Sequence, residues 1–225
     1  MKPPRDIPAP TTAAAPAARA VRPEPVLLLI SAPSGGGKTT VCQQLLAAVP
    51  DLTRIVTCTT RAPRPGETDG EDYHFLGLEE FERRVAAGEF LEHAQVYGHR
   101  YGTLRSEVAA RLRSGRDVLL TVDVQGAASI RECAAADAEL RAALVTVFLT
   151  PSSVEVLAER LARRGHDAPA VVARRLAAAR REVADWHRFD YLVLSSTVAE
   201  DLRRVRAIYE AEKMRSRRSV APAGV

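Results

Sequence analysis

A glycine-rich segment, Ser31–Thr40, carries the residues of this sequence that are best suited to chemistry. Its glycines let the backbone fold closely around an anion with N–H groups pointing inward, and Lys38 adds a mobile cation. The hydroxyl of Thr39 is a suitable ligand for Mg²⁺. The apolar run Val26–Ile30 predicts a buried parallel strand before the segment, and apolar residues at helical spacing predict a helix after it, ending near Pro50. Strand, glycine-rich turn and helix in this order predict a binding site for a nucleoside triphosphate.

A second polar segment, residues 59–75, is too long for a simple turn inside a compact domain, and such loops are usually functional or disordered. Arg61 and Arg64 stand three residues apart around Pro63. Two guanidinium groups held in this way can bind a phosphate through paired hydrogen bonds, which lysine does less well. Tyr73 can add a hydroxyl donor, so the segment predicts a second phosphate site.

Other charged residues stand where a phosphate-transfer enzyme would need them. Asp123 follows the apolar run Val118–Val122 and therefore lies at the end of a predicted parallel strand, the edge at which α/β sheets bind ligands. The helix predicted after Pro151 carries Arg160 and Arg164 on one face, because they are four residues apart.

The order of the predicted elements indicates the fold class. Strands alternate with helices throughout, which predicts an α/β domain with a parallel sheet covered on both faces. A chain of 225 residues suits one such core with insertions rather than two cores. Besides the strands already named, we expect strands at residues 54–58, 90–97, 144–149 and 189–194.

Both ends of the chain have a composition of their own. Residues 1–25 hold seven of the fourteen prolines with much alanine, which predicts a disordered extension outside the fold. The last predicted helix, with Thr197 and Glu200 at its start, frays into a basic tail at residues 213–225. The folded domain is therefore expected over residues 26–212.

Composition excludes several classes of protein. The net charge of +4 comes from arginines spread along the chain, and no aromatic interleaving or recognition motif accompanies the basic tail, so nucleic acid is not favoured as a partner. Three cysteines far apart without a CxxC pair argue against disulfides and a zinc site and for a reducing cytosol. No apolar run approaches the ~20 residues that span a membrane. We expect a cytoplasmic protein without a membrane partner, either a monomer or a homo-oligomer.

Several motifs taken together resemble those of the guanylate kinases. The pattern TTRxPRxGExxGxDYxF at residues 59–75 is specific to that family, whereas the glycine-rich loop alone is not. The other matching stretches are Ser31–Thr40, Phe90–Gln95, Tyr101–Thr103, Val122–Gly126 and the pair Arg160 and Arg164 before Gly165. The resemblance covers roughly residues 26 to 212.

This resemblance implies a fold and a reaction. The fold is the three-layer P-loop NTPase fold with a parallel core sheet, a GMP-binding insertion at about residues 57–105 and a helical lid at about residues 155–182. The reaction is ATP-dependent phosphorylation of GMP, and of dGMP, to the diphosphate by in-line phosphoryl transfer, with release of ADP and with Mg²⁺ as the cofactor of ATP.

The resemblance also implies a role for each matching residue. ATP would be bound by Ser34, Gly35, Gly36, Gly37, Lys38, Thr39 and Thr40, with Thr39 as the metal ligand. The phosphate of GMP would be held by Arg61, Arg64, Tyr73 and Tyr101. The guanine base would be read by Thr57, Glu92, Thr103 and Asp123. The catalytic cations would be Lys38, Arg160, Arg164 and Arg175.

Elementary chemistry supports these roles. Guanine presents two neighbouring donors, N1–H and the N2 amino group, which a carboxylate such as Glu92 can accept together, whereas adenine presents an acceptor at N1. A buried site built for such bonds rejects the mismatched base by a factor of order 10⁴. No general base is needed, because the second pKa of GMP near ~6 leaves its phosphate largely ionised at neutral pH. The difficulty is electrostatic, and cations address it.

Four residues depart from the pattern of the family. Ala32, Thr121, His166 and Ser195 stand where its members often carry Gly, an acid, Thr and Asn. They leave open a guanylate-kinase-like paralogue with a shifted substrate. A non-catalytic interaction module is the other alternative, but such modules tend to lose the phosphate loop that is present here.

Overall fold

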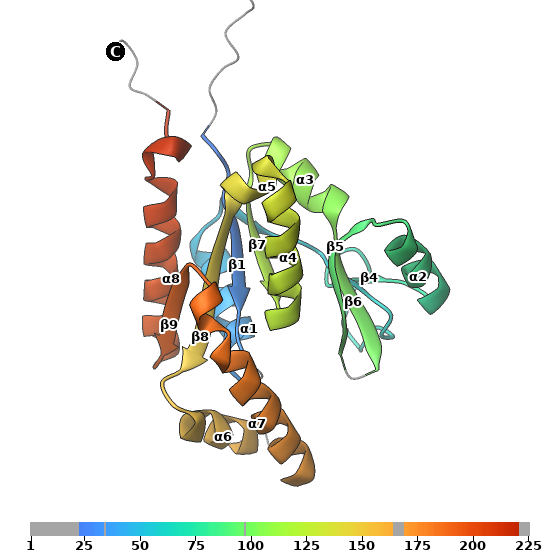
Figure 1. Cartoon of the computed structure of the whole chain (residues 1–225), viewed down its shortest axis with the longest axis vertical. Helices are drawn as coiled ribbons and strands as arrows, with labels where there is room; N and C mark the ends of the chain where they lie inside the picture. Colours follow the sequence, from blue (N-terminus) through green and yellow to red (C-terminus); the bar gives the residue numbers. More distant parts are fainter. Residues whose placement is uncertain (1–22, 34, 97, 164–168, 221–225) are drawn as a thin grey trace, which may run out of the picture.

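Five parallel strands form the core sheet of the computed structural model, which describes residues 23–33, 35–96, 98–163 and 169–220 (Figure 1). In their order across the sheet they are β2 (Leu52–Arg54), β7 (Asp117–Val122), β1 (Leu27–Ser31), β8 (Leu144–Pro151) and β9 (Tyr191–Ser195). Every residue of the central strand β1 is buried. Burial on both faces explains why this strand is a continuous apolar run rather than an alternating one.

Helices cover both faces of the core sheet. α1 (Lys38–Ala48) and α8 (Val198–Lys213) pack on one face, and α3 (Arg105–Arg113), α4 (Val124–Ala136) and α5 (Ala138–Ala143) pack on the other. Neighbouring residues of β1 point alternately into the two resulting hydrophobic clusters, Leu28 into the first and Leu29 into the second. The predicted parallel α/β fold with three layers is therefore confirmed.

A second, four-stranded sheet lies beside the core, and its strands come between β2 and α3 in the chain (Figure 1). Its strands in order are β4 (His74–Phe75), β3 (Cys58–Thr59), β6 (His99–Leu104) and β5 (Phe90–Val96). Helix α2 (Leu78–Ala86) packs on it by stacking Phe81 on Phe90. The prediction of a single strand at residues 54–58 is wrong, because β2 ends at Arg54 in the core sheet and β3 begins at Cys58 in the second sheet. The chain leaves the core within these few residues.

Two helices extend beyond the carboxyl edge of the core sheet (Figure 1). They are α6 (Val154–Arg163) and α7 (Pro169–Ala184), the helices of the predicted lid. They pack on each other through Leu157, Leu176 and Ala179. A short 3-10 helix, η1 (Trp186–Arg188), then leads the chain back into β9.

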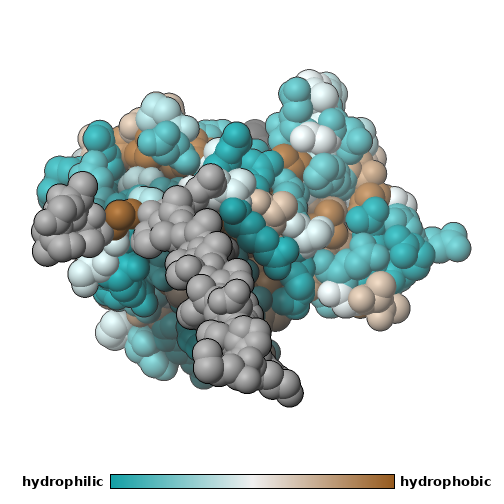
Figure 2. Space-filling model, turned by 90° about the horizontal axis from the view of Figure 1, so that it is seen from above, coloured by the Kyte–Doolittle hydropathy of each residue, from teal (hydrophilic) through white to brown (hydrophobic). Residues whose placement is uncertain are grey.

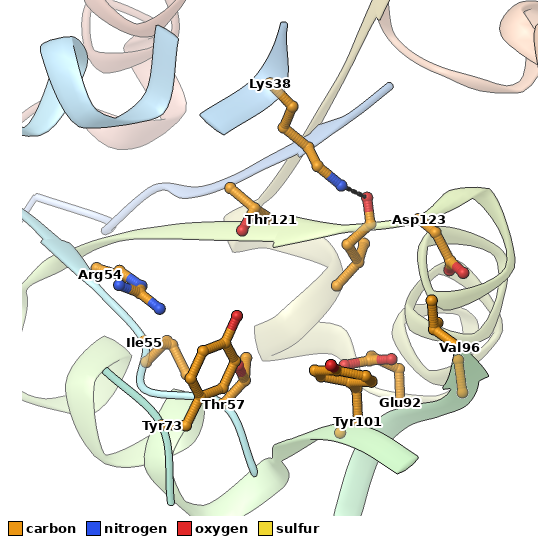
Figure 3. A pocket seen from close by; sticks show the side chains of 13 residues that line it. Lys38, Arg54, Ile55, Thr57, Tyr73, Glu92, Val96, Tyr101, Thr121 and Asp123 are labelled. Atoms are coloured by element: carbon orange, nitrogen blue, oxygen red, sulfur yellow. Dashed lines mark hydrogen bonds between the residues drawn. The ribbon is translucent and has the colours of Figure 1, made fainter. Parts of the chain in front are cut away.

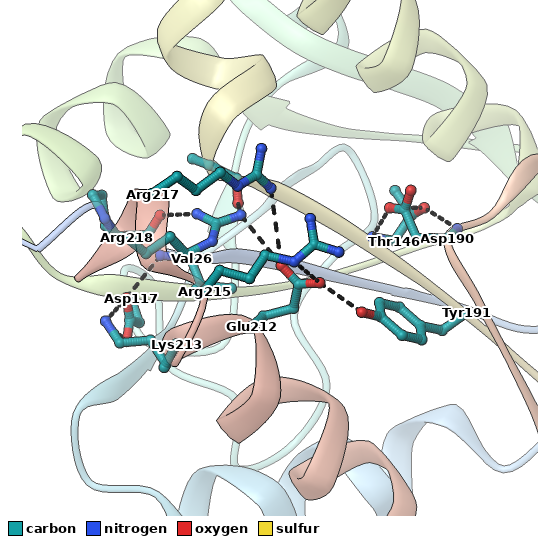
Figure 4. Close-up of polar contacts among 12 residues, drawn as sticks. Val26, Asp117, Thr146, Asp190, Tyr191, Glu212, Lys213, Arg215, Arg217 and Arg218 are labelled. Carbon is teal, nitrogen blue, oxygen red and sulfur yellow. Dashed lines mark hydrogen bonds and ion pairs between the residues drawn. The ribbon is translucent and has the colours of Figure 1, made fainter.

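The C-terminal segment is docked on the domain, unlike the frayed basic tail that the sequence suggested (Figure 4). After α8 the chain forms the 3-10 helix η2 (Ser216–Arg218), and the side chain of Arg218 is fully buried. Its guanidinium donates to the carbonyl oxygen of Pro25 at 2.9 Å and lies 3.6 Å from the carboxylate of Glu212. That carboxylate also accepts from the hydroxyl of Tyr191 at 2.6 Å. These groups stand at the amino edge of the sheet, opposite the edge at which ligands bind.

The face of the molecule in Figure 2 is mainly hydrophilic, and its hydrophobic residues form small separate groups. Among the residues that the structure describes, the most exposed large hydrophobic side chains, Met214 and Leu78, lie on different parts of the fold. No helix of the described ranges is long and apolar enough to cross a membrane.

Candidate active site

Two cavities meet at the carboxyl edge of the core sheet. One, of about 290 Å³, lies over the glycine-rich loop and the start of α1. The other, of about 260 Å³, lies between the core sheet and the second sheet (Figure 3). Lys38 and Asp123 line both cavities. Groups bound in the two cavities would therefore face each other at these two side chains.

The glycine-rich loop needs its glycines for two reasons. Gly35 and Gly37 have φ values of 88° and 91°, a conformation that other residues adopt only under strain. A Cβ on Gly36 would lie 2.9 Å from the Cβ of Ala32 and 3.0 Å from the carbonyl oxygen of Pro33, so the loop is folded tightly on itself. Ala32, a departure from the family pattern, is buried in this fold of the loop. Its methyl group is accommodated as long as residue 36 has no side chain.

Lys38 is the first residue of α1 and reaches across to the end of β7. Its Nζ donates to the carbonyl oxygen of Val122 at 2.8 Å (Figure 3). Burial lowers the pKa of Lys38, and the nearby Asp123 carboxylate opposes this effect. The hydrogen bond holds the ammonium group at the junction of the two cavities.

Glu92, on strand β5, brings a carboxylate to the wall of the cavity between the two sheets. It is 7% exposed, and the hydroxyl of Thr103 donates to its Oε1 at 2.6 Å. Burial raises the pKa of Glu92 to about 7, with a smaller contribution from Asp123, while the Thr103 hydroxyl opposes the rise. A Cβ on Gly126 would lie 2.9 Å from Oε2, so the first turn of α4 has room for this carboxylate only because residue 126 is glycine.

Asp123 has a structural contact as well as a place in the site. Its Oδ1 accepts from the backbone N–H of Gly126 at 2.8 Å and thereby caps the N-terminus of α4. The same side chain lines both cavities. Capping fixes its rotamer, so the carboxylate is held rigidly beside Lys38.

Only two of the four predicted GMP-phosphate residues line the cavity between the two sheets. Tyr73 and Tyr101 line it, with ring centroids 6.1 Å apart. Arg61 lies beside them, with its guanidinium 5.4 Å from the ring centroid of Tyr73, and is held by Glu67 through bonds of 2.8 and 2.9 Å. Arg64 is exposed, and neither arginine lines the cavity.

The predicted base-reading residues also divide. Thr57, Glu92 and Asp123 line the cavity, whereas Thr103 is fully buried behind Glu92. Thr103 therefore contacts the carboxylate and not the cavity.

The arginine side chains of the lid helices are only partly described. Arg160 donates from Nη1 to the hydroxyl of Ser195 at 3.0 Å, and the same nitrogen would lie 3.8 Å from a Cβ on Gly37. Arg175 stands half-buried on α7. The predicted site residues Ser34 and Arg164 lie outside the described residues, as does the greater part of the N-terminal extension, residues 1–22.

Three polar residues that line the cavities were not assigned to the site from the sequence. Arg54 and Thr121 line the cavity between the sheets, and Figure 3 shows Arg54 on the side opposite Glu92. Glu182 of α7 lines the cavity over the loop. Arg54 is the last residue of β2, at the edge where ligands bind, but the pattern of the sequence places it at the start of a strand over residues 54–58. Nothing local in the sequence marks Glu182.

The cavity over the loop is lined by Thr39, Asp123 and Glu182, whose side chains carry oxygen donors. These oxygen donors suit Mg²⁺, which usually binds through few protein ligands and the phosphates of its nucleotide. Within the described ranges, no group of three His, Cys, Asp or Glu side chains could hold a metal ion by itself. The donor set thus fits a metal ion that arrives with a nucleotide.

Comparison with known proteins identifies the family. The guanylate kinase family model matches residues 24–212. The chain belongs to the guanylate kinase family. It is 44% identical over 200 residues to the guanylate kinase of Symbiobacterium thermophilum, covering 89% of this chain and 92% of that one. It is 45% identical over 195 residues to the guanylate kinase of Paramagnetospirillum magneticum, covering 87% and 88% of the two chains.

A solved structure of the family agrees with this assignment. The crystal structure of guanylate kinase from Anaplasma phagocytophilum matches with a TM-score of 0.70 and 33% identity, over 89% of this chain and 92% of that one. The family, the fold class and the assignment as a phosphotransferase that phosphorylates GMP with ATP are confirmed predictions. The comparisons support neither the paralogue with a shifted substrate nor the non-catalytic module.

Proposed function

We propose that this guanylate kinase binds ATP over the glycine-rich loop and GMP in the cavity between the two sheets. The γ-phosphoryl group then passes between them at Lys38 and Asp123. One observation carries this proposal: these two residues line both cavities, so the donor and acceptor phosphates meet there. The insertion at about residues 57–105 would then be the GMP-binding subdomain, and the helices at about residues 155–182 the lid.

The guanine base of GMP is read at the inner end of the cavity. The ionised carboxylate of Glu92 accepts from N1–H and from the N2 amino group, and the Thr103 hydroxyl fixes the orientation of that carboxylate from behind. Thr57 and Asp123 line the same cavity and complete the recognition of the base. Because a carboxylate has no donor for N1 of adenine, AMP binds less well. The site accepts dGMP as well as GMP in this proposal.

The phosphate of GMP is held at the outer end. Tyr73 and Tyr101 line the cavity, and their hydroxyl groups would donate hydrogen bonds to the phosphate. Glu67 holds the guanidinium of Arg61 beside the ring of Tyr73. Arg64 follows three residues later in the same loop, and its side chain is exposed. A small movement of the insertion toward the core brings both guanidinium groups onto the phosphate, where paired hydrogen bonds are strong.

The chemical step is governed by charge. The nucleophile is an oxygen of GMP that is already ionised, so the chain supplies cations rather than a general base. Lys38 stabilises charge on the transferring group, and Arg160, Arg164 and Arg175 supply further positive charge to it. Thr39 would hold Mg²⁺ bound with ATP, which supplies further positive charge to the triphosphate.

The cellular setting follows from the sequence. We propose that the enzyme works in the cytosol on the two small-molecule substrates, because its three cysteines are spaced for neither disulfides nor zinc.

Two threonine variants test the assignment of the two cavities. Thr57→Val removes a hydroxyl from the GMP cavity and should raise KM for GMP about fivefold, the usual size of one neutral hydrogen bond, with KM for ATP unchanged. Thr39→Val removes the metal ligand and should affect ATP and kcat but not GMP binding. Thr53→Val is the control, because the Thr53 hydroxyl donates to the carbonyl oxygen of Asp117 away from both cavities. If both site variants changed the same KM, the assignment would be wrong.

A further inference from the structure

A buried carboxylate outside the two cavities lies directly behind a lid arginine. Asp201 is on the first turn of α8 and is 3% exposed. Its Oδ2 accepts from the hydroxyl of Ser195 at 2.6 Å, and its Oδ1 accepts from the backbone N–H of Ser196 at 2.9 Å. Both oxygens are thus engaged by neighbouring residues at the end of β9.

The same two residues receive the guanidinium of Arg160. Its Nη1 donates to the hydroxyl oxygen of Ser195 at 3.0 Å, and its Nη2 donates to the carbonyl oxygen of Ser196 at 3.3 Å. The hydroxyl of Ser195 has one hydrogen, and Asp201 takes it, so the lone pairs of that oxygen are left to accept from Arg160. Asp201 therefore determines the direction of the hydroxyl on which Arg160 depends.

Arg160 is at the same time close to the glycine-rich loop. Its Nη1 would be 3.8 Å from a Cβ on Gly37, the residue directly before Lys38. The contacts to Ser195 and Ser196 thus hold the guanidinium beside the loop while the helix that carries it, α6, projects beyond the sheet.

Helix capping does not account for Asp201. The N-terminus of α8 is capped by Thr197, whose hydroxyl accepts from the backbone N–H of Glu200 at 3.2 Å. The carboxylate of Asp201 points instead back to Ser195 and Ser196. A buried charge is unfavourable unless its bonds are made, so its placement here needs a reason beyond the helix.

We propose that Asp201 is a positioning residue for catalysis. Through Ser195 and Ser196 it holds Arg160 at the phosphate loop before the nucleotides arrive, so that less ordering is needed when the charge of the transition state develops. The inference rests on the proposed role of Arg160 in phosphoryl transfer. Preorganised cations of this kind act on kcat more than on KM.

A double-mutant cycle tests the proposal in the full-length enzyme. Asp201→Asn keeps the size of the side chain but presents an amide donor to one of the two groups that donate to it now. We expect kcat to fall about tenfold, the size of one charge-assisted hydrogen bond, with KM for GMP changed less than about twofold. In the Arg160→Ala background the same substitution should change kcat less than about twofold, because the arginine that it positions is gone.

Controls separate this role from a structural one. Glu200→Gln removes a negative charge from the same turn of α8, where Glu200 contacts Arg203 and Arg204, and should leave kcat unchanged. Ser195→Ala removes the hydroxyl itself and should reproduce the loss if Asp201→Asn folds poorly. An equal loss from Asp201→Asn or Ser195→Ala in both backgrounds would overturn the proposal, as would full activity of Arg160→Ala. Failure of the proposed reaction would be seen separately, as absence of GDP formation by the unsubstituted enzyme.

Discussion

Glu92 should reduce the stability of the ligand-free enzyme while providing its base specificity, so Glu92→Gln should separate the two effects. Burial raises the pKa of Glu92 from 4.5 to about 7. When the pKa of a carboxyl group is higher in the folded state than in the unfolded state, the folded state is favoured while the group is protonated. Its contribution to the free energy of unfolding is complete below the unfolded pKa and is lost as the pH rises through the folded pKa. The pKa difference of about 2.5 corresponds to about 3 kcal/mol of lost stability above pH 7.

Glutamine removes this loss because it is neutral at every pH, and its oxygen can still accept from Thr103. Glu92→Gln should therefore raise the free energy of unfolding of the ligand-free protein at pH 8 by up to about 3 kcal/mol. For a chain of this length that is a rise in Tm of roughly 6 to 12 °C. The gain should be absent near pH 4.5 and should grow as the pH approaches 7.

The same substitution should damage the reaction. The amide presents a donor to one guanine donor, and a charge-assisted bond is lost, which together cost about 2–4 kcal/mol in kcat/KM for GMP, or roughly 30- to 1,000-fold. ATP binding should barely change, because Glu92 does not line the cavity over the glycine-rich loop. AMP should be affected less than GMP, since it has no paired bond to lose.

The pH dependence of the unsubstituted enzyme gives a second readout. With a pKa of about 7, Glu92 is only about one-tenth ionised at pH 6 and about nine-tenths ionised at pH 8. Ionisation of Glu92 by itself should therefore raise kcat/KM for GMP about tenfold between these two pH values. Glu92→Gln should retain only the smaller rise due to the phosphate of GMP.

Thermal unfolding without nucleotides and initial rates over pH 5.5–8.5 test these expectations. The control is Glu89→Gln, since Glu89 is a partly exposed carboxylate just before the same strand, paired with Arg83 and Arg84, and its loss should not raise Tm. A lower Tm of Glu92→Gln at pH 8, or equal losses for GMP and AMP, would refute the reasoning.

Three further predictions follow from the geometry. Lys38→Ala should lower kcat by about 10²-fold or more with an unchanged circular dichroism spectrum, and near-normal turnover would contradict its place at the junction of the cavities. Gly126→Ala should displace Glu92, because the new Cβ would lie 2.9 Å from its Oε2. KM for GMP should rise about tenfold, with KM for ATP unchanged. The same KM for GMP in the variant and the unsubstituted enzyme would show that the carboxylate moves freely. Arg218→Ala should remove the buried guanidinium that binds Pro25 and Glu212, although Glu212 keeps its contacts with Tyr191 and Arg215. The free energy of unfolding should fall by about 1–3 kcal/mol, seen as a fall in Tm of roughly 2–12 °C, while kcat measured at 25 °C stays within about twofold. An unchanged Tm would mean that the docked C-terminus contributes nothing.

The parts of the site that the sequence predicted depend on local patterns. The glycine-rich loop, its flanking strand and helix, and Asp123 at the end of β7 each follow from a few neighbouring residues. The family motifs added Glu92 and Tyr101, which local patterns alone would not have assigned. Both line the cavity.

The parts that could not be predicted depend on contacts between distant residues. A run of strand-forming residues does not show that β2 and β3 join different sheets, so Arg54 was missed as a residue of the cavity. The burial of Arg218 depends on Pro25 and Glu212, and an arginine-rich stretch at the end of a chain gives no sign of such partners.

The tight packing at the base site was equally hidden. Position 126 on α4 requires glycine because the carboxylate of Glu92, on β5 of the second sheet, lies against it. The place of Arg61 beside Tyr73 depends on Glu67, and the pairing of these two charges within the loop could not be read from their spacing.

The central claim is that a phosphoryl group passes from ATP to GMP between two cavities that share Lys38 and Asp123. The most direct test is kcat/KM of the full-length enzyme for GMP, dGMP, AMP, CMP and UMP, with ATP and Mg²⁺ at fixed concentration and the diphosphate product identified. The account predicts GDP formation with a preference for GMP over AMP of order 10⁴. A higher kcat/KM for any base other than guanine, or ATP hydrolysis without formation of a nucleoside diphosphate from the acceptor, would contradict it.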